Sequence, residues 1–298
     1  MLALAQSRWV ADKLMRVHEG FVVEPLFVVT TGDRIQDRSL VEIGGKGLFV
    51  KEIEQALQCG EARFAVHSVK DMPAVLAPGL VLACVPVRED PRDAFLSRSG
   101  ICLSQVAPGT RVGTSSLRRR MMLSRARPDL RFEPLRGNVD TRMRKVREGV
   151  VDATVLAQAG LCRLGMEDVA TEVFDAEVIL PAVGQGALGI ECREDDVEMR
   201  ELLSVLNDAE TAVAVAVERG VLVGAAGSCQ LPIAAYACRD AEGLLWLRAM
   251  LATEDGLTLE RVCIRCGWPE AGALGFALGI EVGDGLRREV AGRSRCTV

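Results

Sequence analysis

The stretch LPAVGQGALGIECR, residues 180–193, has the composition of a β-strand that enters a sheet from a glycine-rich loop. Another strand-rich crossing lies near residues 86–92. We call it the first crossing, and we call the one near residues 183–190 the second crossing. Two such crossings predict two α/β lobes with a cleft between them. In this arrangement the chain leaves the first lobe, builds the second, and then returns to complete the first.

Helix-like and strand-like segments alternate on both sides of these crossings. Val10, Leu14 and Val17 recur at helical spacing, whereas FVVEPLFVVT at residues 21–30 is an extended, strand-like run. Segments of the same two kinds follow one another beyond the first crossing. Alternation of this type is typical of α/β layers, so we expect a largely parallel sheet.

The residues after Leu206 follow a different pattern. A helix from Asp208 to about Val223 leads through a turn of small residues into strands, and an Ala/Gly-rich helix begins at about Glu270. This order predicts a smaller α/β domain with an antiparallel sheet. The expected domains are residues 1–88 with 186–206, residues 89–185, and residues 207–298.

The composition is that of a folded protein with several domains. The chain has 298 residues, 49% of them hydrophobic, and no apolar run approaches the roughly 20 residues that cross a bilayer. It begins without the pattern of a secretion signal, so we expect a cytoplasmic protein with no membrane partner. Most of its ten cysteines lie in apolar segments, as buried and reduced thiols do.

The one close pair of cysteines, Cys263 and Cys266, does not favour a metal site. A structural zinc ion needs about four ligands, but there is no second CxxC and the only histidines are His18 and His67. The pair also lies in a strand-like stretch, where residues three apart point to opposite faces. We therefore expect no metal.

Positive charge is concentrated in the second lobe. The net charge is -5, yet residues 111–147 hold eleven arginines and one lysine against three acidic residues. Two motifs there, VGTSSLRRR (112–120) and LRGNVDTRMRK (135–145), each run from a strand through a glycine to an N-capping residue and arginines. A helix N-terminus with guanidinium groups binds anions such as carboxylates. A solvated basic helix face is an alternative, and so is a nucleic-acid site, although Phe132 is the only aromatic platform there.

Three further motifs hold candidate functional residues. AVHSVKDMP places Lys70 and Asp71 at the end of a strand, where α/β sheets bind ligands, or where the two form an ordinary surface pair. GGKGLFVKE surrounds Lys46 with glycines, as in a mobile flap or in a plain loop before a helix. GAAGSCQLP puts Cys229 in a turn of small residues, as an accessible nucleophile or as a structural cysteine.

Taken together, these motifs resemble hydroxymethylbilane synthase, also called porphobilinogen deaminase. The resemblance rests on GGKGLFVKE, AVHSVKDMP, REDPRDAF, GTSSLRRR, RPDL, LRGNVDTR, LAQAGLCRLG, LPAVGQGALGIECR and GSCQLPIAAYA, in family order from about residue 2 to residue 237. It implies two lobes similar to type II periplasmic binding proteins and a small C-terminal α/β domain that carries the cofactor cysteine. It also implies a transferase that joins four porphobilinogen molecules head to tail, releases ammonia each time, and frees the linear tetrapyrrole by hydrolysis.

The resemblance implies a role for each candidate residue. Chain growth would start on a dipyrromethane cofactor held by a thioether to Cys229. Asp71 would be the catalytic carboxylate, which stabilises positive charge on pyrrole nitrogens and helps to move protons. The cofactor would be bound by Lys70, Thr114, Ser115, Ser116, Arg118, Arg119 and Gln185, and the substrate by Lys46, Arg136, Arg142 and Arg163.

One departure from the family concerns the first residues. Family members normally begin with a strand and a TRxSPLAL-type motif, whereas this sequence starts at Leu2-Ala3-Leu4. The expected consequence is a gap in the first sheet and the loss of one carboxylate-binding arginine, through either a late start codon or an impaired product. We expect a form with roughly a dozen more residues to be more soluble and more active.

Two other functions remain open on the sequence alone. One is a two-lobe anion-binding module without catalysis, and the other is a nucleic-acid-associated regulator. A covalent dipyrromethane adduct on the intact protein would separate both from the synthase. The sequence has no long heptad repeat and no obvious apolar interface, so we expect a monomer.

Overall fold

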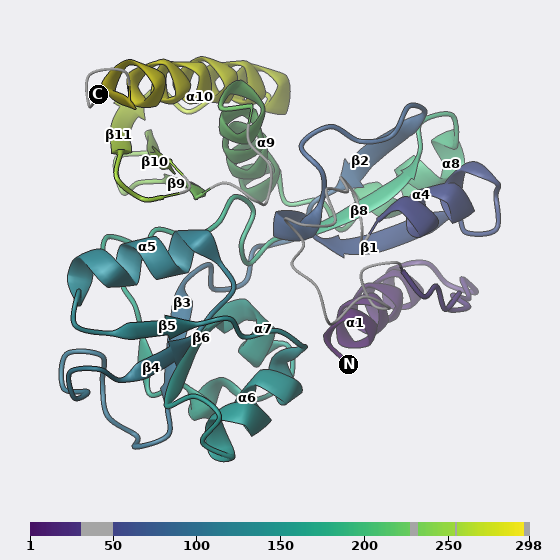
Figure 1. The fold of residues 1–298 in the computed structure, drawn as a ribbon. Coiled ribbons are helices and arrows are strands. Elements are labelled where there is room, and N and C mark those ends of the chain that lie inside the picture. Colours follow the sequence, from purple (N-terminus) through teal and green to yellow (C-terminus); the bar gives the residue numbers. More distant parts are fainter. Residues whose placement is uncertain (31–49, 227–231, 254, 295–298) are drawn as a thin grey trace.

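The computed structural model describes residues 1–30, 50–226, 232–253 and 255–294, and their strands form three sheets (Figure 1). We call the elements around the sheet β1-β8-β2 the first lobe, those around β5-β4-β6-β3-β7 the second lobe, and those around β11-β10-β9 the third domain. The fold is therefore mixed α/β with a separate C-terminal domain. Lys46 and Cys229 lie outside the described residues.

The sheet of the first lobe takes its middle strand from the second crossing. β8 (Leu188–Arg193) lies between β1 (Phe64–Ser68) and β2 (Leu80–Cys84) and runs antiparallel to both. The stretch at residues 180–193 thus re-enters the first lobe, as the sequence predicts. Because β8 holds both neighbours in register, the first lobe is complete only after the chain has built the second.

Helices cover both faces of this first sheet. α1 (Leu2–Val17) and α8 (Val197–Ser204) pack on one face, where Val10 and Leu14 are buried as their helical spacing predicts. α4 (Lys51–Gln58) packs on the other face through Leu57. The sheet therefore lies between two helical layers.

The second lobe has a mixed sheet. β4 is parallel to β5 and β6, whereas β3 is antiparallel to β6 and β7. The strands are β3 (Asp93–Ser97), β4 (Arg111–Gly113), β5 (Arg131–Glu133), β6 (Ala153–Ala157) and β7 (Glu172–Val173). The helical elements are α5 (Leu117–Ala126), α6 (Val139–Arg147), α7 (Gln158–Cys162) and the short 3-10 turn η2 (Glu167–Val169).

The third domain is an antiparallel sheet covered by two helices, as the sequence predicts. The strands are β9 (Ile233–Arg239), β10 (Leu245–Ala252) and β11 (Leu259–Cys266), and the helices are α9 (Ala209–Gly224) and α10 (Gly272–Ser294). One face of the sheet packs on both helices through residues such as Leu247, Val221 and Leu286.

The two helices of the third domain pack unusually closely, because glycines line the seam between them. A methyl group on Gly279 would lie 2.1 Å from the carbonyl oxygen of Val217, and one on Gly220 would lie 2.2 Å from that of Phe276. Only glycine leaves room for backbones at this distance. α9 and α10 therefore form one closely packed pair.

The third domain also completes the hydrophobic cores of both lobes. Ala234 and Met250, on the sheet face opposite the helices, share a buried cluster with Phe95 and Leu123 of the second lobe. Val215 of α9 joins a buried cluster of the first lobe. The third domain thus packs against both lobes.

Two expectations from the sequence are wrong. The first-lobe sheet is antiparallel in the described residues, because β8 enters it from the opposite direction. The strand expected at residues 21–30 does not form, and Val22 and Phe27 in that run are 74% and 72% exposed. An extended run needs a neighbouring strand for its backbone hydrogen bonds, and none of the described strands pairs with it.

The described cysteines agree with the expectation of reduced thiols. All eight of them are free, and Cys84 and Cys192 are buried. Burial raises the pKa of Cys84 to about 12, which keeps it an unreactive thiol. Cys263 and Cys266 lie on β11, so the strand expected for this pair is confirmed. Among the described residues, no helix is both long and apolar enough to span a membrane.

Candidate active site

Lys70 and Asp71 lie where the first lobe meets the second crossing. They follow β1 directly, in the 3-10 turn η1 (Val69–Asp71), and the backbone N–H of Val69 donates to the carbonyl of Ala187 at 3.1 Å. Burial lowers the pKa of Lys70 to about 8, although the carboxylate of Asp71 opposes this shift. Lys70 is therefore held close to a carboxylate in a poorly solvated position.

The first turn of α5 is the second part of the site. Ser116 is the N-cap residue, and its side chain accepts a hydrogen bond from the backbone N–H of Arg119. The hydroxyl oxygen of Thr114 accepts from the N–H of Ser116, and the hydroxyl of Ser115 donates to the carbonyl of Leu135. The helix start expected from the sequence is confirmed, and its N-terminal end carries the positive end of the helix dipole.

Arg118 and Arg119 are buried, with 5% and 6% of their surfaces exposed, rather than spread on a solvated helix face. Both guanidiniums bind the fully buried carboxylate of Asp93, each at a closest distance of 2.7 Å. Burial alone would raise the pKa of Asp93, but the two guanidiniums hold it well below its usual range. The alternative of an exposed basic face is therefore wrong for these two arginines.

Gln185 connects this ion cluster to both crossings. It lies on the second crossing, is 1% exposed, and donates through Nε2 to the carbonyl of Pro91 on the first crossing at 2.6 Å. The same nitrogen donates to Asp93 Oδ1 at 3.1 Å. The side chain thus fixes the place where the chain passes between the lobes.

Arg142 brings α6 to the same site. Its helix is capped by Asn138, whose side chain accepts from the N–H of Thr141, as the sequence predicts. Burial lowers the pKa of Arg142 to about 10, and Arg119, Asp71 and Arg136 all contribute to the electrostatic potential at this residue. A cation of the second lobe therefore lies within electrostatic range of the carboxylate of the first lobe.

Arg163 occupies a different position from the other arginines. Its guanidinium donates to the carbonyl of Gly186 at 2.6 Å and lies near Glu89, beside the place where the two crossings touch. A methyl group on Gly186 would meet the carbonyl oxygen of Glu89 at 2.3 Å, so the crossings are in close backbone contact. Burial lowers the pKa of Arg163, which the nearby Glu89 opposes.

The structure thus brings together residues from both lobes that are far apart in sequence. The gathered side chains are Lys70, Asp71, Arg118, Arg119, Arg136, Arg142 and Gln185. Thr114, Ser115 and Ser116 adjoin them at the start of α5. The placement of Lys46 and Cys229 stays a prediction, since both lie outside the described residues.

Three charged residues of this region had no role in the sequence prediction. Asp93 is the first residue of β3, directly before an apolar run, and Glu218 directly follows the apolar residues 212–217 of α9. Arg88, on the first crossing, pairs with Glu218. A single charge within an apolar element is a visible signal of a buried ion pair, but the sequence does not show which partner it has.

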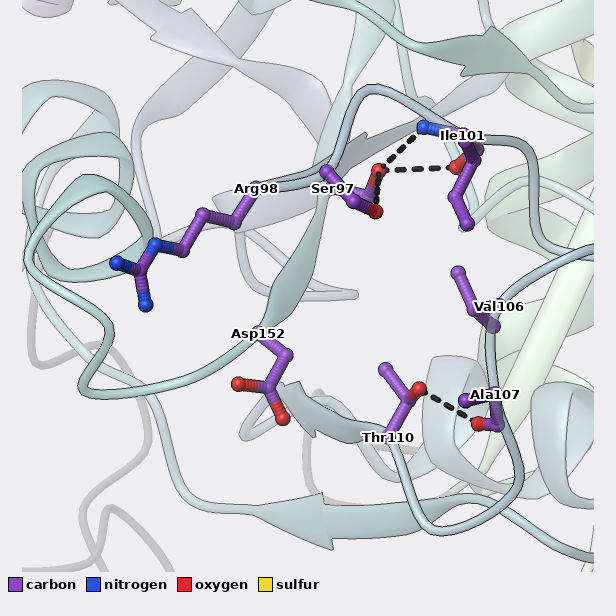
Figure 2. A pocket seen from close by; sticks show the side chains of 8 residues that line it. Ser97, Arg98, Ile101, Val106, Ala107, Thr110 and Asp152 are labelled. Carbon is purple, nitrogen blue, oxygen red and sulfur yellow. Dashed lines mark hydrogen bonds between the residues drawn. The ribbon is translucent and has the colours of Figure 1, made fainter.

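Two hollows on the surface of the described residues lie apart from this cluster. One of about 440 Å³ opens between the loops of the second lobe, where Ser97, Thr110 and Asp152 line it (Figure 2). Two of its hydroxyl groups are bonded to nearby backbone, that of Ser97 to Ile101 and that of Thr110 to Ala107. The other, of about 450 Å³, lies between the exposed side of α5 and the third domain. Neither hollow is lined by a predicted site residue.

Fold and site together define the class: a mixed α/β protein with two lobes, a separate C-terminal domain, and a cluster of buried arginines where the crossings meet. Comparison with known proteins gives the family. Residues 1–201 match the model described as "Porphobilinogen deaminase, dipyromethane cofactor binding domain", and residues 212–286 match "Porphobilinogen deaminase, C-terminal domain".

Curated relatives agree with both matches. The porphobilinogen deaminase of Sorangium cellulosum is 58% identical over 95% of this chain and 96% of its own length. That of Paenibacillus macerans is 55% identical over 81% of this chain and 76% of its own. Among solved structures, an arginine-specific periplasmic binding protein of Salmonella typhimurium aligns with a TM-score of 0.37 and 12% identity, covering 71% of this chain and 83% of its own. The chain belongs to the porphobilinogen deaminase family of transferases, which carry a dipyrromethane cofactor and serve tetrapyrrole biosynthesis.

Proposed function

We propose that this chain joins four porphobilinogen molecules head to tail on its dipyrromethane cofactor, releases ammonia at each addition, and then frees the linear tetrapyrrole by hydrolysis. One observation supports the assignment of the site more than any other. The carboxylate of Asp71, at the end of β1, lies within electrostatic range of Lys70 and of Arg119 and Arg142 in the second lobe.

The cationic side chains suit the substrate because every added pyrrole brings an acetate and a propionate group. Arg118, Arg119 and Arg142 offer guanidinium donors, and Lys70 adds an ammonium group. Guanidinium groups bind carboxylates through two parallel hydrogen bonds, and in a poorly solvated site these charge-assisted bonds are strong. We assign Arg118 and Arg119 to the cofactor, and Arg136, Arg142, Arg163 and Lys46 to the substrate.

Asp71 is the residue we assign to the chemical step. Addition of a pyrrole unit places positive charge on a ring nitrogen of the substrate, and a fixed carboxylate beside that nitrogen stabilises the charge. The same carboxylate accepts or returns a proton when ammonia leaves and when the ring regains its aromatic state. Asp71 is exposed, so it can reach a bound molecule.

The donors near the start of α5 fit the cofactor that the family carries. Bound through a thioether to Cys229, the cofactor would supply the terminal pyrrole carbon to which each new unit is added. Its carboxylates match the backbone N–H groups at the start of α5 and the side chains of Thr114, Ser115 and Ser116. Lys70, Arg118, Arg119 and Gln185 would complete that binding site.

An intact-mass measurement tests this function. The purified chain should carry the extra mass of one dipyrromethane and consume porphobilinogen, whereas Cys229→Ser should carry no adduct and remain folded. A chain that binds porphobilinogen reversibly without an adduct would instead be an anion-binding module. An unmodified chain that binds nucleic acid would be a regulator.

We propose in addition a cytoplasmic monomer, with the domain boundaries 1–88 with 186–206, 89–185 and 207–298. The free thiols of the described part suit a reducing compartment. Light scattering after size exclusion tests the monomer, and limited proteolysis tests the boundaries.

A further inference from the structure

Asp93 is the shared partner of three residues that we assign to the cofactor. It is the first residue of β3, directly after the first crossing, and its side chain is completely buried (0% exposed). Oδ1 accepts from Nε and Nη2 of Arg119 at 2.9 and 2.7 Å, and Oδ2 accepts from Nη1 of Arg118 at 2.7 Å. Gln185 donates to Oδ1 from the second crossing at 3.1 Å.

Backbone carbonyls hold the same two guanidiniums from other sides. Nη1 of Arg118 donates to the carbonyl of Leu180 at 2.6 Å, and Nη1 of Arg119 donates to that of Val155 at 2.9 Å. Each guanidinium has five N–H groups, so neither arginine uses all of its donors in these bonds. Both arginines are thus fixed in orientation and still able to bind a carboxylate.

The charges of this cluster are unequal. Two guanidiniums face one carboxylate, and Lys70 lies within electrostatic range of all three groups. Burying two arginines without a counterion would be very costly, whereas two buried carboxylates would cancel their charge. A single carboxylate keeps the arginines buried and leaves a net positive charge for an anionic ligand.

We propose that Asp93 is a positioning residue of this enzyme, which holds Arg118 and Arg119 ready for the carboxylates of the pyrrole chain before any ligand arrives. The inference rests on the proposed function. Donors already oriented in a dry site need no rearrangement when the ligand binds, which strengthens binding. Gln185 links the orientation of the pair to the crossing that returns to the first lobe.

The test compares Asp93→Asn with Asp152→Asn. Asp152 binds Arg111 of the same lobe through both oxygens, at 3.1 and 2.9 Å, but this pair lies away from the cluster. For Asp93→Asn we expect the fraction of molecules with the dipyrromethane mass to fall about 10-fold, because the arginines that hold the cofactor lose their orientation. We also expect a higher KM for porphobilinogen, because the substrate binds beside a misplaced cofactor. The kcat per cofactor-bearing molecule should change by only a few fold, because the lost contacts stabilise the bound substrate and the transition state equally. Asp152→Asn should keep both the KM and the adduct.

A folded Asp93→Asn protein with the KM and the adduct fraction of the wild type would overturn the proposal. If that variant does not fold, the double variant Asp93→Asn with Arg119→Gln removes one charge of each sign. It should have a higher KM than Arg119→Gln alone, and an equal KM would reject a role of Asp93 through Arg118. A wild-type chain that neither carries the adduct nor consumes porphobilinogen would instead contradict the function itself, and the inference with it.

Discussion

The carboxylate of Glu218 accepts two hydrogen bonds from the guanidinium of Arg88, at 2.6 and 3.1 Å. The same carboxylate accepts from the backbone N–H of Gly184 at 2.7 Å and from that of Ala237 at 2.9 Å. Arg88 lies on the first crossing, Gly184 on the second, and Ala237 in the third domain. One fully buried carboxylate therefore joins both crossings to the third domain.

Removing this carboxylate should destabilise the whole molecule. In Glu218→Gln the buried guanidinium of Arg88 loses its counterion, and we expect the free energy of unfolding to fall by about 3 kcal/mol. Urea unfolding followed by circular dichroism measures this loss. Arg63→Gln is the control, because Arg63 is 43% exposed in its pair with Asp196 and should contribute about 1 kcal/mol or less. Equal losses in the two variants would contradict the role of Glu218.

Asp71→Asn should separate catalysis from folding. The variant keeps the shape of the side chain but cannot stabilise positive charge, so we expect turnover to fall by at least about 100-fold while the adduct on Cys229 and the melting temperature stay unchanged. Single-turnover consumption of porphobilinogen measures the effect. The control is Asp168→Asn, which changes an exposed acid of the second lobe that is not part of the site, and this variant should have normal turnover. Near-normal turnover in Asp71→Asn would remove this residue from the mechanism.

Lys70 should limit activity at high pH. Its pKa is lowered from 10.5 to about 8, and only the protonated form attracts carboxylates, so kcat/KM should decline above about pH 8. In Lys70→Arg the charge persists, and the decline should move to higher pH. An unchanged profile in Lys70→Arg would assign the decline to another group.

The same shift predicts how stability depends on pH. The unfolded state keeps the lysine proton up to about pH 10.5, whereas the folded state loses it near pH 8, so the unfolded state binds more protons between these values. The contribution of Lys70 to stability should therefore rise with pH across this window. Unfolding titrations of wild type and Lys70→Met at both ends of the window test the sign.

Two glycines of α10 should respond to alanine in opposite directions. A methyl group on Gly279 would force α9 and α10 apart, so Gly279→Ala should cost about 1–3 kcal/mol of unfolding free energy. Around Gly285 no heavy atom lies within 4 Å of the added methyl group, so Gly285→Ala should gain about 0.5–1 kcal/mol. Thermal melts of the two variants measure the difference. A stabilising Gly279→Ala would mean that the helices do not pack through this seam.

Local signals in the sequence predicted much of the fold and of the site. Ser116, Asn138 and Asp208 begin their helices as expected, since a capping side chain bonds to backbone groups within its own turn. Features that depend on partners far away in the sequence were harder to predict. The prediction of a strand at residues 21–30 was wrong, because a strand needs a neighbouring strand to pair with and composition does not reveal one.

The site shows the same division. Lys70 and Asp71 could be placed at a strand end, and the arginines could be placed near helix starts, because those positions follow from local patterns. The ion cluster around Asp93 could not be predicted, since it joins residues 25 and 92 positions away in the chain. Arg118 and Arg119 are buried because they belong to that cluster. From an arginine-rich helix alone, one would expect these side chains to be exposed to solvent.

The shared cores have a consequence for how this polypeptide folds while it is being made. The strands of the second lobe have all been synthesised by Val173, yet Ala234 and Met250, which cover part of its core, follow much later. A ribosome that stalls between these points would release a chain with an uncovered apolar surface, prone to aggregate. The second lobe should therefore stay in solution only once β9 and β10 have been synthesised and cover this surface.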